Sequence, residues 1–100
     1  MKKQLLETIY KSLDEINENL NDAKKLIKDK NTVLFGKDGQ LDSLGLVNLL
    51  VIIEQNIEDE FDVSITIADE RAMSQKHSPF RTIGSLGDYI EMLLKEELND

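Results

Sequence analysis

The chain has 100 residues, of which 40% are hydrophobic and 32% are charged, and its formal net charge is −8 at pH 7. That length and composition are typical of one globular domain around a single core, which we assign to residues 1–100. The acidic balance argues against nucleic-acid binding, which needs a basic surface. The absence of cysteine excludes disulfides, thiolate metal sites and a cysteine nucleophile.

Apolar side chains recur at steps of three and four residues from Leu5 to Ile27, and charged side chains fill the opposite face. This pattern predicts an amphipathic helix over residues 3–27, with Asn21 as the place where it would break. The periodicity fails from residue 28 to residue 42, where two glycines and an Asp38-Gly39 turn signal predict a long loop. We expect the consecutive apolar residues 33–35 of this loop to pack onto the core.

Asp42 is placed to cap a second helix, predicted over residues 43–60. One apolar stripe of this helix suits the core and consists of Leu46, Leu49, Leu50, Ile53, Ile57 and Phe61. A second stripe, made of Leu44, Val47 and Val51, lies on a different face of the helix. The second stripe either meets a partner, packs partly into the core or lines a cavity.

Residues 61–67 alternate apolar and polar side chains like a strand, but no second strand is expected to pair with them. We therefore interpret them as an extended connector. Thr66 and Asp69 resemble a capping box that starts a short helix at about residues 68–75, and Thr82 is placed to cap a last helix over residues 83–97. The predicted fold class is all-α, a four-helix bundle with a long first loop and a short third helix.

Ser43 is the strongest candidate for a functional residue, because it lies in the first turn of the most apolar helix, just after the long loop. A helix N-terminus presents unpaired amides and the positive end of the macrodipole, which favour a phosphate group. A serine in this position is a good attachment point for a group linked through a phosphodiester. The simpler interpretation of Ser43 is that it is only a residue of the first helical turn, beside the aspartate that caps the helix.

Residues 39–44, Gly-Gln-Leu-Asp-Ser-Leu, resemble the Asp-Ser-Leu site of acyl carrier proteins and related phosphopantetheine-binding domains. The resemblance covers nearly the whole chain, including the Thr-Ile-Gly-Ser-Leu entry to the last helix at residues 82–86. It implies that the Ser43 hydroxyl carries 4′-phosphopantetheine as a covalent cofactor, with Asp42 and Leu44 on either side. A separate phosphopantetheinyl transferase would install this arm from coenzyme A, and its thiol would hold the cargo as a thioester.

The same resemblance implies that the chain is not an enzyme but presents its cargo to acyl- or aminoacyl-activating and acyl-transferring enzymes. The residues expected to contact such partners are Asp42, Leu44, Val47 and Val51, together with Glu54 and Glu58 from an acidic cluster completed by Asp59, Glu60 and Asp62. This cluster would steer the carrier toward basic enzyme surfaces, or it would only keep the helix end solvated.

The sequence departs from fatty-acid-type carriers, in which acidic residues commonly stand at the positions of Gly45 and Asn48. The run from residue 43 to residue 61 is also about one turn longer than in that type. Both departures favour a carrier for a specialised or aminoacyl pathway over a housekeeping fatty-acid carrier. The cargo is therefore expected to be a fatty, polyketide or other acyl group, with aminoacyl or peptidyl cargo as an alternative. An unmodified adaptor that binds a protein partner is a further alternative.

Other site types are disfavoured by what the sequence lacks. There is no Gly-x-Ser-x-Gly elbow for a serine hydrolase, and the one available base would be His77 in a predicted loop. Asp38 and Asp42 do not have the spacing of a calcium-binding loop, so no metal site is expected. Because no apolar run is long enough for a signal peptide or a membrane span, we expect a cytoplasmic monomer.

Overall fold

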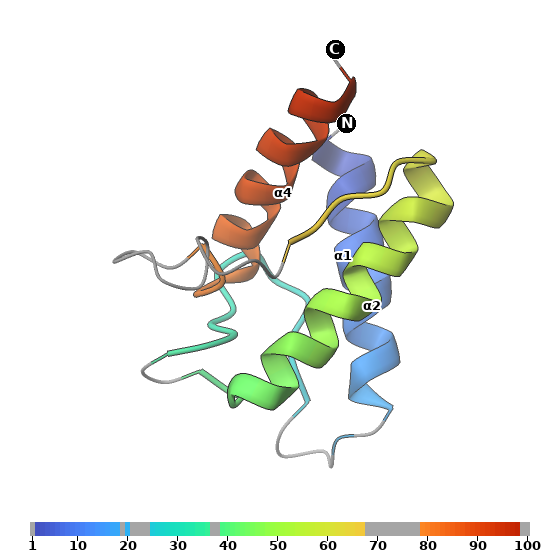
Figure 1. The fold of residues 1–100 in the computed structure, drawn as a ribbon. Coiled ribbons are helices and arrows are strands. Elements are labelled where there is room, and N and C mark those ends of the chain that lie inside the picture. The colour runs from blue at the N-terminus through green and yellow to red at the C-terminus, as the bar shows by residue number, and fades with distance from the viewer. Residues whose placement is uncertain (1, 19, 21–24, 37–38, 68–78, 99–100) are drawn as a thin grey trace.

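The computed structural model describes residues 2–18, 20, 25–36, 39–67 and 79–98. In this part of the chain there are three helices, α1 (Lys2–Asn17), α2 (Ser43–Phe61) and α4 (Ile83–Leu98), and α1 packs against both of the others (Figure 1). The all-helical prediction is confirmed for these residues. The short helix expected at residues 68–75 lies outside the described residues, as do Asp69 of its predicted cap and His77. None of the described helices is long and apolar enough to cross a membrane.

The first helix is shorter than predicted, because α1 ends at Asn17 and residues 25–27 are not helical. The Asn17 side chain forms two hydrogen bonds with the backbone of Leu26, accepting from its N–H at 2.8 Å and donating to its carbonyl at 3.0 Å. Leu26 is thereby held in the core at 4% exposure, whereas Ile27 is 72% exposed. The prediction that one helix continues to residue 27 is therefore wrong, and Asn21 lies outside the described residues.

The long first loop is confirmed, and it is fastened to the start of α4. The N–H of Leu34 donates to the Arg81 carbonyl at 2.6 Å, and the N–H of Ile83 donates to the Thr32 carbonyl at 3.1 Å. Leu34 is fully buried, as expected for residues 33–35, and Val33 and Phe35 are partly buried. A Cβ on Gly84 would lie 3.0 Å from the Lys30 carbonyl oxygen, so this close backbone approach depends on glycine.

The apolar stripe of α2 that was predicted to suit the core, from Leu46 to Phe61, lies in the core; we call it the inner stripe. Phe61 at its end is half-buried. The core also takes side chains from α1 and α4, among them Leu5, Ile9, Leu13, Leu86, Ile90 and Leu94. One buried polar residue of α2, Asn56, donates to Ser12 Oγ at 2.9 Å and to Glu15 Oε2 at 2.6 Å, both on α1. These bonds are satisfied only in one alignment of the two helices, so they specify the register between α1 and α2.

The predicted cap of the last helix, Thr82, is confirmed. Thr82 Oγ1 accepts from the Ser85 N–H at 3.0 Å, and Ser85 Oγ accepts from the Thr82 N–H at 3.1 Å, which closes a reciprocal capping box at the start of α4. The connector is extended from residue 63 to residue 67 and passes between α2 and α4 (Figure 1). It is held by Glu54, whose Oε2 accepts from the N–H of Ile67 at 2.7 Å.

We predict that Asn17→Ala lowers the free energy of unfolding by about 1–3 kcal/mol, because both backbone polar groups of Leu26 lose their partners. Urea denaturation followed by circular dichroism would measure this as a lower midpoint with an unchanged m-value. The control is Asn48→Ala, since Asn48 is exposed on α2. Equal midpoints for the two variants would contradict a stabilising role of Asn17.

Candidate functional site

Ser43 is the first residue of α2, and it is exposed. The cap of this helix is provided by its neighbour, since Asp42 Oδ1 accepts from the N–H of Gly45 at 2.7 Å and the Asp42 carbonyl accepts from the N–H of Leu46 at 2.9 Å. The helix therefore does not need the Ser43 hydroxyl to satisfy its first amides. An accessible hydroxyl at a well-defined helix start is available to a modifying enzyme.

The electrostatic environment of Ser43 suits a phosphodiester. The helix that follows has 19 residues, and its first turn contains no acidic side chain. The aligned peptide dipoles place partial positive charge at its N-terminus, where the Asp42 carboxylate also lies as the cap. A singly charged phosphodiester on Ser43 would lie at this positive end of the helix.

Beyond Ser43, the stripe of Leu44, Val47 and Val51 faces solvent; we call it the α2 stripe. Leu44 is 70% exposed, Val47 38% and Val51 42%. Of the alternatives that the sequence left open, packing into the core is therefore wrong for these three residues. Exposed apolar side chains gathered on one helix face are typical of a surface that contacts another molecule.

The acidic cluster predicted at the end of α2 serves more than one purpose. Glu58 and Asp59 are exposed, and helical spacing places Glu58 on the same face as the α2 stripe. Glu54 is half-buried and holds the connector through Ile67, and Glu60 lies 3.7 Å from Lys11 Nζ on α1. Asp62 adopts a left-handed backbone conformation, with φ 55°, as the C-cap of α2. Part of the cluster thus has a structural role, while Glu58 and Asp59 face solvent beyond the stripe.

A groove of about 520 Å³ lies beside the first half of α2, with Gly45 at its end nearer the helix start. Of the three residues for which the sequence left a cavity-lining role open, Val51 is in its described lining, and the other residues of the groove were not predicted. We call it the α1–α2 groove; among the residues that the structure describes, its lining contains Ile16 and Leu20, Leu41, and, on α2, Gly45, Asn48, Val51 and Ile52. A Cβ on Gly45 would lie 3.1 Å from Asp42 Oδ1 and 3.3 Å from Leu41 Cδ2, so a side chain here would crowd the cap. Residues 45, 48 and 52 are spaced three and four positions apart in the sequence, so their common helix face, which forms one side of the groove, was predictable.

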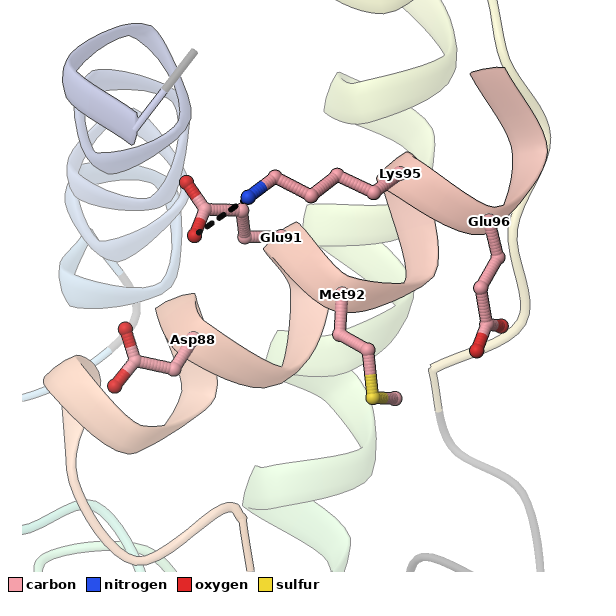
Figure 2. Close-up of a pocket in the computed structure, with 5 residues that line it drawn as sticks. All are labelled: Asp88, Glu91, Met92, Lys95 and Glu96. Atoms are coloured by element: carbon pink, nitrogen blue, oxygen red, sulfur yellow. Dashed lines mark ion pairs between the residues drawn. The ribbon is translucent and has the colours of Figure 1, made fainter. Parts of the chain in front are cut away.

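A second hollow, also of about 520 Å³, lies on α4 and is lined by Asp88, Glu91, Met92, Lys95 and Glu96 (Figure 2). Its charges are largely paired, since Lys95 Nζ lies 3.9 Å from Glu91 Oε1 and Asp88 pairs with Lys2. Figure 1 shows the start of α2 and the C-terminal half of α4 toward opposite ends of the molecule. This hollow is therefore separate from the Ser43 site.

No protein-family model, curated protein or solved structure matches the chain. Across the part of the chain that the structure describes, no three acidic or histidine side chains gather closely enough to hold a metal ion. The chemistry of the Ser43 end, with its capped helix start, exposed stripe and neighbouring groove, is what remains to indicate a function.

We predict that Asp42→Ala destabilises the protein by about 1 kcal/mol, because the N–H of Gly45 loses its acceptor. Amide hydrogen exchange would show faster exchange at Gly45 and at the other amides of the first turn of α2. Asp42→Asn is the matched control, because its amide oxygen can still accept the same hydrogen bond. Loss of protection in both variants alike would mean that the cap is not what holds the first turn.

Proposed function

We propose that the protein is an acyl carrier, with 4′-phosphopantetheine attached to Ser43 and with cargo held as a thioester on the thiol of that arm. The observation that carries the proposal is the exposed Ser43 at the start of the most apolar helix, where Asp42 already supplies the cap. The Asp-Ser-Leu motif at residues 42–44 and the acidic composition support it.

The proposed modification needs only a hydroxyl from this chain. Ser43 Oγ would attack the phosphorus of coenzyme A that bears the pantetheine, forming one P–O bond while the bond to 3′,5′-ADP breaks. The hydroxyl proton leaves to the transferase or to water, and the bridging oxygen leaves with the bonding electron pair on the 5′-phosphate of 3′,5′-ADP, while the transferred phosphate keeps one negative charge as a phosphodiester. Since the chain has no cysteine, the arm would supply the thiol for thioester chemistry. In this function the chain itself catalyses no step.

Partner enzymes would bind across the outer face of α2. The α2 stripe offers apolar contact area close to Ser43, and the exposed Glu58 and Asp59 offer negative charge further along the helix. A partner with an apolar patch bordered by Lys or Arg would complement this face. Such contacts are weakened by salt, which suits a carrier that has to leave each enzyme after one step.

Two alternatives remain beside acyl carriage. Gly45 and Asn48 leave the helix without the acidic residues of fatty-acid-type carriers, which supports a specialised cargo, including an aminoacyl or peptidyl group. The exposed α2 stripe would also serve an unmodified adaptor that binds a protein partner directly. Modification of Ser43 distinguishes the carrier from the adaptor.

The decisive experiment is intact mass spectrometry after incubation with coenzyme A, Mg²⁺ and a phosphopantetheinyl transferase of broad specificity. We expect wild-type protein to gain the mass of one phosphopantetheine, and Ser43→Ala to gain nothing. Ser64→Ala is the matched control, because Ser64 is also exposed but lies in the connector, and it should be modified like wild type.

An unmodified wild-type protein would contradict the carrier proposal. If wild-type protein and Ser43→Ala also captured the same partner with equal affinity, the adaptor alternative would be favoured.

We also predict that Glu58→Lys lowers kcat/KM of the transferase for this carrier roughly threefold to tenfold at low salt, because an exposed negative charge on the docking face is reversed. The difference should shrink as the salt concentration rises. Glu7→Lys makes the same change of charge on the exposed face of α1 and is the control. Equal effects of the two substitutions would show that only net charge matters and that α2 has no special part in docking.

A further inference from the structure

The connector after α2 is an extended segment that lacks a partner strand. Its residues 63–67 are Val-Ser-Ile-Thr-Ile, and the four β-branched residues among them favour a strand conformation. Within the described part of the chain, no backbone N–H or carbonyl of residues 63–66 takes part in a hydrogen bond. Water satisfies these groups instead, so they are available to pair with a strand from another molecule.

The amide of Ile67 shows how the two edges of the connector are oriented. Its N–H points to Glu54 Oε2 on α2, at 2.7 Å. In an extended chain the backbone polar groups of successive residues point to opposite edges, so those of Ser64 and Thr66 point away from α2, toward α4. Figure 1 shows the connector between these two helices. Ser64 and Thr66 are about 7 Å apart along the chain, which is the repeat of the hydrogen-bonding pattern between neighbouring strands.

A pocket of about 250 Å³ lies along this α4-facing edge, and we call it the connector pocket. Among the described residues it is lined by Ser64, Ile65 and Thr66 of the connector and by Leu93, Glu96 and Glu97 of α4. Glu96 lies on the side of α4 next to the connector (Figure 2). The pocket thus has apolar walls from Ile65 and Leu93, which are half-buried, and a rim of two exposed carboxylates.

The charge of the connector pocket favours a cation. Glu96 and Glu97 lie in the last turn of α4, where the macrodipole already places partial negative charge, so helix stability does not explain them. Neither forms an ion pair within the part of the chain that the structure describes. The aliphatic stem of a Lys or Arg side chain would contact Ile65 and Leu93, while its charged end reaches the carboxylates.

We infer that the connector is a docking edge for an extended, basic segment of a partner protein. The segment adds a strand beside Ser64 and Thr66 and places a Lys or Arg side chain in the connector pocket. A second copy of this chain does not fit as the occupant, because it would bring a formal net charge of −8 and the same two carboxylates to the edge. The inference goes beyond the proposed carrier function and does not depend on modification of Ser43.

The experiment titrates the protein with the peptide acetyl-Thr-Val-Lys-Val-Thr-amide at low salt and follows amide NMR shifts. We expect a dissociation constant on the order of millimolar, because two backbone rungs and one ion pair are few contacts. Shifts should be concentrated at the residues of the connector pocket. With peptide at about ten times the dissociation constant, solvent exchange of the Ser64 and Thr66 amides should slow about tenfold, while that of Val63 and Ile65 stays unchanged.

Two N-methylated peptides test whether a strand is added. One is methylated at the backbone nitrogens of both valines, and the other at those of the lysine and the last threonine, so each blocks one edge of the peptide. Only one of them should bind more weakly than the parent peptide, by at least about fivefold, because only one edge pairs with the connector. Equal affinities of the two methylated peptides, or unchanged exchange at Ser64 and Thr66, would overturn the inference.

A charge reversal tests the connector pocket. The same peptide with glutamate in place of lysine should bind wild-type protein about threefold to tenfold more weakly at low salt. Glu96→Lys combined with Glu97→Lys should reverse this preference, and α4 should remain folded, because lysine in the last turn suits the macrodipole. The control is Glu7→Lys combined with Glu18→Lys, which makes the same change of charge at exposed residues elsewhere and should keep the wild-type preference. An equal preference in the two double variants would contradict binding in the pocket.

Discussion

The backbone pairing between the first loop and the start of α4 is the constraint on which the geometry of the molecule depends. Hydrogen bonds join Leu34 to Arg81, Ile83 to Thr32 and Gly84 to Lys30, although these residues are about fifty positions apart in the chain. The pairing closes a long loop that would otherwise be free to move, and it buries Leu34 in the core. Since Leu41 also donates its N–H to the Leu34 carbonyl at 3.0 Å, the same network positions the residue just before Asp42 and Ser43.

From that anchored start, α2 divides its side chains between two environments. Its inner stripe is fully buried from Leu46 to Ile57, and each such side chain contributes about 1.5–3 kcal/mol through removal from water. The α2 stripe, in which Leu44 is 70% exposed, contributes little hydrophobic free energy to folding, because much of its surface stays in water. Apolar residues that do not stabilise the fold are better explained by contact with another molecule, and their place next to Ser43 links that contact to the proposed modification.

The charges on α2 illustrate why residue type alone does not assign a role. Glu54 and Glu58 belong to the same acidic cluster in the sequence, but Glu54 accepts a backbone hydrogen bond from Ile67, whereas Glu58 faces solvent. A substitution of Glu54 would therefore disturb the connector as well as any docking, and Glu58 is the cleaner probe of partner binding. Gly45 combines two roles in a similar way, because it donates to the Asp42 cap and leaves the end of the α1–α2 groove open.

Local signals in the sequence determined the elements that depend on nearby residues. The helices at Ser43–Phe61 and Ile83–Leu98 were predictable from apolar periodicity and from the caps at Asp42 and Thr82, because a cap acts within one helical turn. Ser43 was predictable as the candidate site for the same reason. The end of α1 was not predictable, since it depends on Asn17 pairing with Leu26 nine residues later. Only the tertiary structure placed Leu44, Val47 and Val51 in solvent and joined Ile16 and Leu20 to Leu41 and Gly45 in one groove, because burial and cavities depend on which helices pack together.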